Sequence, residues 1–227
     1  MSRRSLLEKV CSEQIIGVVR EESADVAAHV IDAYAKNGIR VIEVTMTTPE
    51  AVELMTTAAA KYASSEIIIA AGTVRSTNDA ALARRAGAQV IVSPHTDLRV
   101  IEYANENDLL SIAGASTPTE IIRAWEGGCD IVKIYPAAHL GGPDYIRVIR
   151  GPIRDIPMLA GGPVPLDTID AYLDSGCVAV NLGPSLAVPD LVRGGQWDEI
   201  GRRCVLAASI VQSRRQVAQS EPSTYVH

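Results

Sequence analysis

The chain has 227 residues, a formal net charge of -6 and a pI near 5.3. Hydrophobic residues make up 47% of it and Phe is absent, so its core consists mainly of Ala, Val, Ile and Leu. This length allows two small domains or one α/β barrel. The acidic balance argues against a nucleic-acid partner and against a basic membrane-binding patch.

The cysteines, the N-terminus and the apolar runs bear on the compartment. The four cysteines show no CxxC spacing, which favours reduced thiols over disulfides or a structural metal site. Residues 1–14 have an amphipathic helix pattern without the apolar stretch of a signal peptide. No apolar run reaches the roughly 18 residues that cross a membrane. We therefore expect a cytoplasmic protein that makes no contact with membranes.

After the opening helix, short β-branched runs alternate with amphipathic helices. The predicted strands are Ile15–Arg20, Arg40–Met46, Ile67–Val74, Val90–Pro94, Leu110–Ser116, Ile131–Pro136, Pro157–Gly162 and Val178–Gly183. The predicted helices are Ala24–Asn37, Pro49–Ala63, Thr77–Ala86, Asp97–Asn107, Thr119–Glu126, Asp144–Ile149, Leu166–Asp174 and Trp197–Ala218. Many helices stop at a glycine, which accepts the left-handed conformation that ends a helix before the next strand.

This alternation predicts a single parallel barrel. The βα units between Gly38 and Gly176 average 23 residues, which is typical of a small (β/α)8 TIM barrel, here with an extra N-terminal helix. A doubly wound open sheet is the alternative, but no GxGxxG motif follows the first strand and no composition break marks a linker. We expect one domain over residues 1–219 and a flexible tail over residues 220–227.

Lys133 lies in the middle of a short apolar strand and needs an explanation. The chain has 17 arginines but only four lysines, and the other three occupy polar positions of predicted helices. A lysine inside an apolar strand must pair with a charge, reach solvent, or lose its proton more easily. In the last case the neutral amine is a nucleophile that forms a Schiff base with a carbonyl carbon. A structural lysine, ion-paired or reaching solvent, is the alternative explanation.

Other unusual residues lie at the carboxyl ends of the predicted strands, where the active groups of parallel barrels gather. Glu43, in the second strand, can move protons beside Lys133, or it can form a structural ion pair with Lys133 or Arg20. Glycines end the last two strands, at Gly161-Gly162 and at Gly183, where such barrels commonly hold a phosphate group. Tight turns without a ligand explain these glycines equally well.

Five segments share their order and spacing with one known enzyme family. They are Ile42–Pro49 (IEVTMTTP), Ala71–Val74 (AGTV), Ile91–His95 (IVSPH), Ser116–Glu120 (STPTE) and Val132–Ala137 (VKIYPA). Over residues 15–186 the chain thereby resembles the bacterial 2-keto-3-deoxy-6-phosphogluconate (KDPG) aldolases. That family includes 4-hydroxy-2-oxoglutarate and phosphogalactonate aldolases.

The resemblance implies a metal-free class I lyase without a cofactor, usually a homotrimer, that cleaves a 2-keto-4-hydroxy acid to pyruvate and an aldehyde. It implies that Lys133 is the Schiff-base lysine and Glu43 the general acid/base. By position, Arg20 and Thr73 hold the pyruvate carboxylate. The further substrate-binding residues that we expect are Pro94, Tyr135, Gly161, Gly162, Gly183 and Ser185. The four scattered histidines show no ligand spacing, so we expect no metal site.

The chain departs from the family pattern where the far part of the substrate binds. Ala160 replaces a common threonine before Gly161-Gly162, and Thr47 replaces an arginine of some members. Residues 181–184 read Asn-Leu-Gly-Pro in place of Gly-Val-Gly-Ser, and proline removes a backbone donor that could meet phosphate.

A KDPG-type sugar acid, cleaved to pyruvate and glyceraldehyde 3-phosphate, is nevertheless the leading substrate. The same mechanism acting on 4-hydroxy-2-oxoglutarate, phosphogalactonate or a non-phosphorylated keto acid is the first alternative. A phosphate-binding barrel isomerase or epimerase, and a non-catalytic ligand-binding barrel, are the others.

Overall fold

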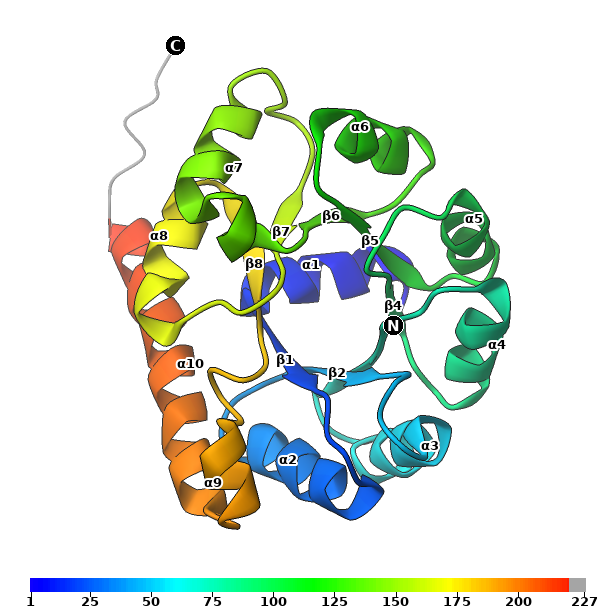
Figure 1. Ribbon diagram of the computed structural model, residues 1–227, viewed down its shortest axis with the longest axis vertical. Coiled ribbons are helices and arrows are strands. Elements are labelled where there is room, and N and C mark those ends of the chain that lie inside the picture. The colour runs from blue at the N-terminus through cyan, green and yellow to red at the C-terminus, as the bar shows by residue number, and fades with distance from the viewer. Residues whose placement is uncertain (221–227) are drawn as a thin grey trace.

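The computed structural model describes residues 1–220, and in it eight parallel strands close into a barrel in chain order. The strands are β1 Ile15–Val19, β2 Val41–Thr45, β3 Ile68–Gly72, β4 Val90–Val92, β5 Leu110–Ala115, β6 Ile131–Ile134, β7 Met158–Ala160 and β8 Cys177–Leu182. Figure 1 looks along this barrel and shows the helices arranged around it. The predicted TIM barrel is confirmed.

The helices follow the strands in the predicted order. They are α1 Arg3–Glu13, α2 Ala24–Lys36, α3 Ala51–Lys61, α4 Thr77–Arg85, α5 Leu98–Glu106, α6 Pro118–Glu126, α7 Gly142–Arg150, α8 Ile169–Asp174, α9 Pro189–Arg193 and α10 Trp197–Ser220, with 3-10 turns η1 Ala137–Leu140 and η2 Leu166–Thr168. The short helix α9 was not predicted. Of the expected C-terminal tail, residues 221–227 lie outside the described residues. None of the helices within residues 1–220 has the length and apolar character of a membrane span.

Apolar side chains fill the barrel towards the amino ends of its strands. One buried cluster takes a residue from every strand, including Ile16, Val41 and Leu159. The helix α1 adds Leu6 and Val10 to the same cluster and crosses the barrel axis in Figure 1. This extra N-terminal helix therefore closes the floor of the barrel, and any site must lie at the other end.

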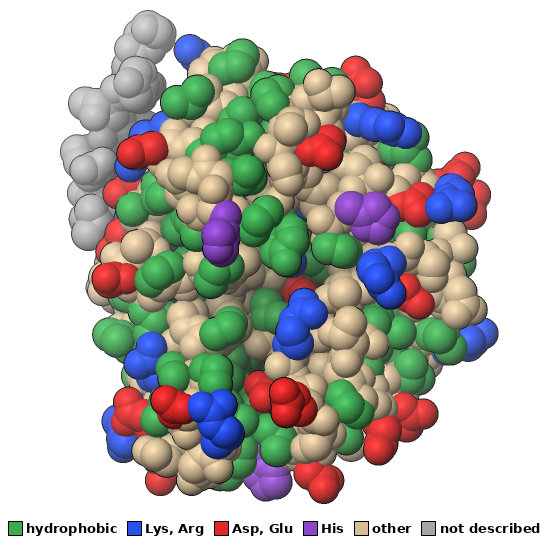
Figure 2. All heavy atoms as spheres, viewed as in Figure 1, with side chains coloured by type: hydrophobic (Ala, Val, Ile, Leu, Met, Phe, Trp, Pro, Cys, Tyr) green, Lys and Arg blue, Asp and Glu red, His purple; other side chains and the backbone are tan. Residues whose placement is uncertain are grey.

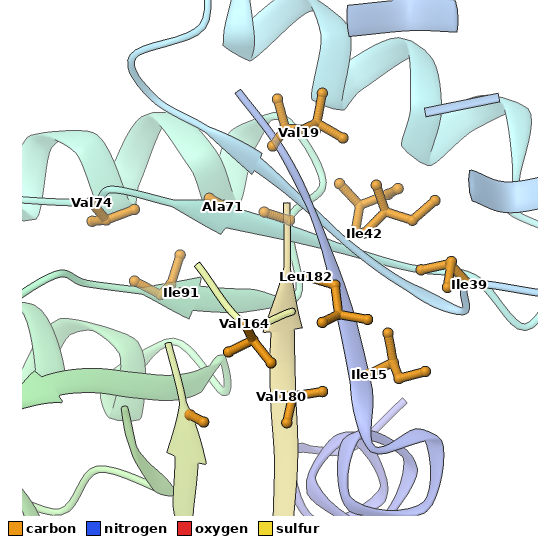
Figure 3. Close-up of a cluster of buried hydrophobic side chains, with 14 of the residues drawn as sticks. Ile15, Val19, Ile39, Ile42, Ala71, Val74, Ile91, Val164, Val180 and Leu182 are labelled. Carbon is orange, nitrogen blue, oxygen red and sulfur yellow. The ribbon is translucent and has the colours of Figure 1, made fainter. Parts of the chain in front are cut away.

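The opposite faces of the strands pack against the surrounding helices. Successive side chains of a strand point to opposite faces, so residues next to the interior ones point outward. Figure 3 shows several of these outward residues, among them Ile15, Val19, Ile42 and Ile91, as part of the larger buried cluster.

The same alternation directs three polar residues into the barrel. Val41 belongs to the interior cluster and Ile42 to the outer one, so Glu43 points inward. By the same period of two, Lys133 follows Ile131 inward from β6, and Asn181 follows Ala179 inward from β8. All three strands have even numbers in the barrel, as expected when alternate strands fill one interior layer.

Candidate functional site

Lys133 and Glu43 meet inside the carboxyl end of the barrel. The Lys133 residue is 8% exposed and Glu43 is 1% exposed. The Lys133 Nζ lies 3.9 Å from the Glu43 Oε1. This distance is too long for a hydrogen bond but short enough for an ion pair, so the amine and the carboxylate face each other as oppositely charged groups.

Glycines on two odd-numbered strands make room for these two side chains. A Cβ atom added at Gly72, at the end of β3, would lie 2.1 Å from the Glu43 Oε1. A Cβ atom at Gly161, just after β7, would lie 2.4 Å from the Lys133 Cε. Real Cβ atoms do not approach this closely, so the glycines are required by packing as well as by any turn.

Arg20 stands at the end of β1 between two hydroxyl groups. Its guanidinium donates to the Thr47 Oγ1 at 3.1 Å and to the Thr73 Oγ1 at 2.9 Å. Thr73 has a φ of 56°, a left-handed conformation that is uncommon for a β-branched residue and is often found at functional sites. Both partners are uncharged, so they orient the guanidinium without neutralising it, and it remains suited to a carboxylate.

Three further predicted residues, Tyr135, Gly162 and Pro94, lie near Lys133 or near the strands next to β6. The Tyr135 ring, 37% exposed, lies with its centroid 5.5 Å from the Lys133 Nζ. Gly162 has a φ of 111°, which favours glycine, and a Cβ there would lie 3.5 Å from the Pro136 Cα. The backbone carbonyl of Pro94 approaches β5 so closely that a Cβ at Gly114 would lie 2.3 Å from it.

A cavity of about 670 Å³ lies beside Arg20. Gly183 and Pro184 line it together with Glu21 and Glu22. Burial raises the pKa of the Glu21 carboxyl, and the neighbouring Glu22 charge adds to the effect. Figure 2 shows this end of the molecule hollowed near its centre, with acidic and basic side chains among apolar ones.

Ser185 does not line this cavity, although its neighbours Gly183 and Pro184 do. Its Oγ is buried without a hydrogen-bond partner among the described residues, and its carbonyl accepts from the Arg203 Nε at 2.8 Å. The described residues that line the cavity include neither Ser185 nor Gly161 and Gly162. The predicted residues thus form one group around Lys133 and Glu43, while Arg20 and Gly183 line the cavity.

Sequence reasoning missed two contacts of the site. Thr47 was noted only as a replacement, yet it binds Arg20. Asn181 was noted only as a departure, yet its Nδ2 donates to the Glu43 Oε2 at 2.5 Å. The signal for Asn181 was the same as for Lys133, because it is a polar residue in the middle of an apolar strand. Among residues 1–220, no three His, Cys, Asp or Glu side chains are arranged to hold a metal ion.

Comparisons with known proteins agree on one family. Residues 7–203 match the family model described as "Aldolase: KDPG and KHG aldolase", where KHG stands for 4-hydroxy-2-oxoglutarate. The 2-dehydro-3-deoxy-phosphogluconate aldolase of Haemophilus influenzae is 28% identical over 199 residues, 88% of this chain and 93% of the relative. The 2-dehydro-3-deoxy-6-phosphogalactonate aldolase of Escherichia coli is 28% identical over 206 residues, 90% of this chain and 96% of the relative.

A solved structure shares the fold. The crystal structure of a KDPG aldolase from Legionella pneumophila superimposes with a TM-score of 0.81 at 21% identity. The match covers 91% of this chain and 98% of that one, so the barrel and its surrounding helices correspond over nearly their whole length.

Proposed function

Because this chain belongs to the family of KDPG and KHG aldolases, which are lyases, we propose that it cleaves a 2-keto-4-hydroxy acid to pyruvate and an aldehyde through a Schiff base on Lys133. The observation that carries the proposal is the buried pair of Lys133 and Glu43, with 3.9 Å between the nitrogen and the nearer carboxylate oxygen. A nucleophilic amine and a proton-transfer group on the same side of a barrel are what an imine-forming aldolase needs.

Lys133 begins the reaction in this proposal. Its amine adds to the C2 keto carbon, and loss of water leaves an iminium ion that withdraws electrons from C3. Glu43 accepts the proton of the C4 hydroxyl while the C3–C4 bond breaks. The bonding electrons move towards the iminium nitrogen, so the aldehyde leaves and the enamine of pyruvate remains. Glu43 then returns a proton to C3, and water releases pyruvate and restores the amine.

Arg20 holds the carboxylate end of the keto acid. The guanidinium is oriented by the hydroxyls of Thr47 and Thr73, at 3.1 and 2.9 Å. Oriented N–H groups and a positive charge together suit a carboxylate, which accepts two parallel hydrogen bonds. Fixing this end orients the keto carbon towards Lys133, and such positioning is a large part of the rate enhancement of enzymes.

A KDPG-type sugar acid, with glyceraldehyde 3-phosphate as the second product, is the first candidate substrate. The names of the relatives support it, and so do Gly162 and Gly183 at the ends of β7 and β8, where such barrels commonly hold a phosphate group. The Gly161 N–H already donates to the Ile134 carbonyl. Because another relative is a 2-dehydro-3-deoxy-6-phosphogalactonate aldolase, the epimeric phosphogalactonate acid is also a candidate substrate.

A second candidate, an aldehyde half without phosphate, is favoured by the residues beyond these glycines. Pro163, Pro165 and Pro184 carry no N–H group, so three backbone positions of the two loops cannot donate to phosphate. The adjoining cavity also contains Glu21 and Glu22, whose charges oppose a dianion. Comparing cleavage of KDPG with that of its dephosphorylated form and of 4-hydroxy-2-oxoglutarate decides between the candidates by the ratio of kcat/KM.

We also propose a cytoplasmic location, because four free thiols suit a reducing compartment.

We further propose a homotrimer, as the resemblance implies. Trp125, 37% exposed, and Ile122, 42% exposed, lie three residues apart on one face of α6, where a neighbouring subunit would bury them.

Trapping with pyruvate tests the covalent step. Borohydride reduction of the protein with pyruvate, followed by intact mass and peptide mapping, is expected to give one stable adduct on Lys133. Lys133→Ala should give no adduct and lose about 10⁴-fold or more in kcat/KM, because the nucleophile is gone. Glu43→Gln should keep the adduct and lose about 10²- to 10⁴-fold in turnover.

Lys36→Ala is the matched control, since this lysine is 70% exposed on α2. It should trap pyruvate like the wild type. Wild-type protein that forms no adduct, or a Lys133→Ala protein that is folded and fully active, would contradict the proposed mechanism.

A further inference from the structure

Asn181 is a buried polar residue that the proposed chemistry leaves without a role. It lies in β8, is 2% exposed, and follows the interior residue Ala179 into the barrel. A side-chain amide among apolar residues is costly unless it forms hydrogen bonds. Its partner is Glu43, because the Asn181 Nδ2 donates to the Glu43 Oε2 over 2.5 Å.

The two oxygens of Glu43 therefore have different neighbours. Oε2 accepts from Asn181, whereas Oε1 faces the Lys133 Nζ at 3.9 Å. The missing side chain of Gly72 makes room for Oε1. The contact with Asn181 fixes the rotation of the carboxylate about its last bond and keeps Oε1 directed towards the lysine nitrogen.

Asn181 is uncharged, and one of its polar atoms is unused. The Asn181 Oδ1 is buried and has no hydrogen-bond partner among the described residues. When Glu43 takes up a proton on Oε1, its Oε2 still accepts the hydrogen bond from Nδ2. When the proton is on Oε2 instead, a half-turn of the amide about its Cβ–Cγ bond lets Oδ1 accept a hydrogen bond from it, and Nδ2 becomes the unpaired group. An asparagine thus serves both protonation states, whereas a fixed positive charge would favour the carboxylate alone.

We propose that Asn181 is a positioning residue that holds Glu43 in both of its protonation states during the aldol cycle. The inference rests on the proposed function, which gives Glu43 the proton-transfer role.

Few charged groups face Glu43. Lys133 approaches Oε1 from β6, and Arg20, after β1, is held by two threonine hydroxyls. The strands on either side of β2 pair with Glu43 through Val18 and Ala70, which do not titrate. A change at position 181 will therefore act on Glu43 and on its coupling to Lys133.

Exchange of the pyruvate methyl protons tests the role without knowledge of the aldehyde. In heavy water, Glu43 removes a C3 proton from the pyruvate imine on Lys133 and the enamine takes up deuterium, which proton NMR follows as a function of pH. Asn181→Leu, close in shape, removes the hydrogen bond. It should slow exchange about tenfold or more and leave borohydride trapping on Lys133 within about twofold of wild type.

Asn181→Asp keeps the size of the side chain and changes its charge, so it separates the effect of Asn181 on Glu43 from its effect on packing. Two carboxylates in contact do not both ionise, so the pair retains one proton to higher pH than Glu43 does alone. The acidic limb of the exchange profile should move up by about one pH unit or more. Ser111→Ala, a buried polar change on β5 away from Glu43, should leave the limb in place. If the leucine variant does not fold, Asn181→Ser, which is smaller, replaces it.

The outcomes separate this inference from the proposed function. If the wild type traps pyruvate and exchanges its protons while the Asn181 variants show the same exchange rates and pH profiles as the wild type, the role of Asn181 alone is overturned. A wild-type protein that neither traps pyruvate nor exchanges its protons would overturn the aldolase chemistry and, with it, this role. A slow leucine variant together with a shifted limb in the aspartate variant supports the role.

Discussion

At the scale of single residues, the candidate site depends on what is absent as much as on what is present. Lys133 and Glu43 occupy the barrel end because Gly72 and Gly161 leave space for them. Such glycines are difficult to recognise in a sequence, since a glycine at a strand end usually indicates a turn. Here Gly72 lies against the Glu43 side chain and Gly161 against the Lys133 side chain.

Gly72→Ala should therefore inactivate the enzyme without unfolding it. The new methyl carbon would lie 2.1 Å from the Glu43 Oε1, so the carboxylate must move away from Lys133. A displacement of about 1 Å costs about 10²-fold in turnover. Steady-state kinetics, with circular dichroism to check folding, measure the effect.

Gly151→Ala is the control for this substitution. Gly151 follows α7, at the opposite end of the barrel, and its φ of -53° suits alanine. Activity should stay within about twofold of wild type in this protein. A folded Gly72→Ala enzyme with equally unchanged turnover would show that Glu43 tolerates displacement.

At the scale of elements, the start of α6 is fixed by a capping box directly after β5. The Thr117 side chain accepts from the Glu120 N–H, and the Glu120 carboxylate accepts from the Ser116 N–H at 2.8 Å and the Thr117 N–H at 2.9 Å. The hydrogen bond from the Ser116 backbone is the largest cause that lowers the pKa of Glu120. The residues of this motif, Thr-Pro-Thr-Glu at 117–120, start α6 one residue before the predicted Thr119, and they fix the loop that follows Gly114.

Glu120→Gln should destabilise the protein in a pH-dependent way. A pKa that is lower in the folded state gives stability above the unfolded value, near 4.3, which is lost as pH falls through the folded value. Because Glu120 is exposed, we expect a loss of less than about 1 kcal/mol in unfolding free energy at pH 7. Urea unfolding at pH 7, 5 and 4 should show the difference from wild type shrinking as the pH falls.

Glu126→Gln provides the comparison, because it removes an exposed carboxylate from the other end of the same helix. A carboxylate near a helix C-terminus is not favoured by the helix dipole, so its loss should not destabilise. If Glu120→Gln lost as much stability at pH 4 as at pH 7, the charge of Glu120 would not be the cause.

At the scale of the whole molecule, Ile122 and Trp125 form an exposed apolar surface on α6; Val148 on α7 and Val205 with Leu206 on α10 are also exposed. Exposed tryptophan and isoleucine one helical turn apart are typical of a surface that is buried in an assembly. The rest of the barrel is closed by its own helices, and α1 covers its floor.

Trp125→Glu should therefore dissociate the proposed trimer. Size-exclusion chromatography with light scattering should give the wild type about three times the 24.2 kDa mass of one chain, and the variant the mass of one. A buried unpaired carboxylate in an interface is strongly unfavourable. Val205→Glu, at a residue that is 54% exposed on α10, should remain trimeric. If the wild type is a monomer, or if the Trp125→Glu protein is still a trimer, the proposed trimer with Trp125 in its interface is wrong.

The order of the strands, the helices between them and the barrel were predictable because they follow from local patterns. Apolar periodicity, glycine at helix ends and a repeat of about 23 residues act within a few turns of chain. Lys133 was also recognisable alone, since a charge in an apolar strand contradicts its surroundings. The helix α9 was missed because its five residues, beginning at Pro189, are too few for a periodic pattern.

The sequence by itself thus predicted the fold and singled out Lys133, Glu43 and Arg20. Only the tertiary structure decided which side chains meet. Asn181 and Glu43 are 138 positions apart, and no local pattern indicates that one donates to the other. Their contact, and the fit of Gly72 against Glu43, exist because the strands close into a barrel that brings distant, inward-facing residues into one layer.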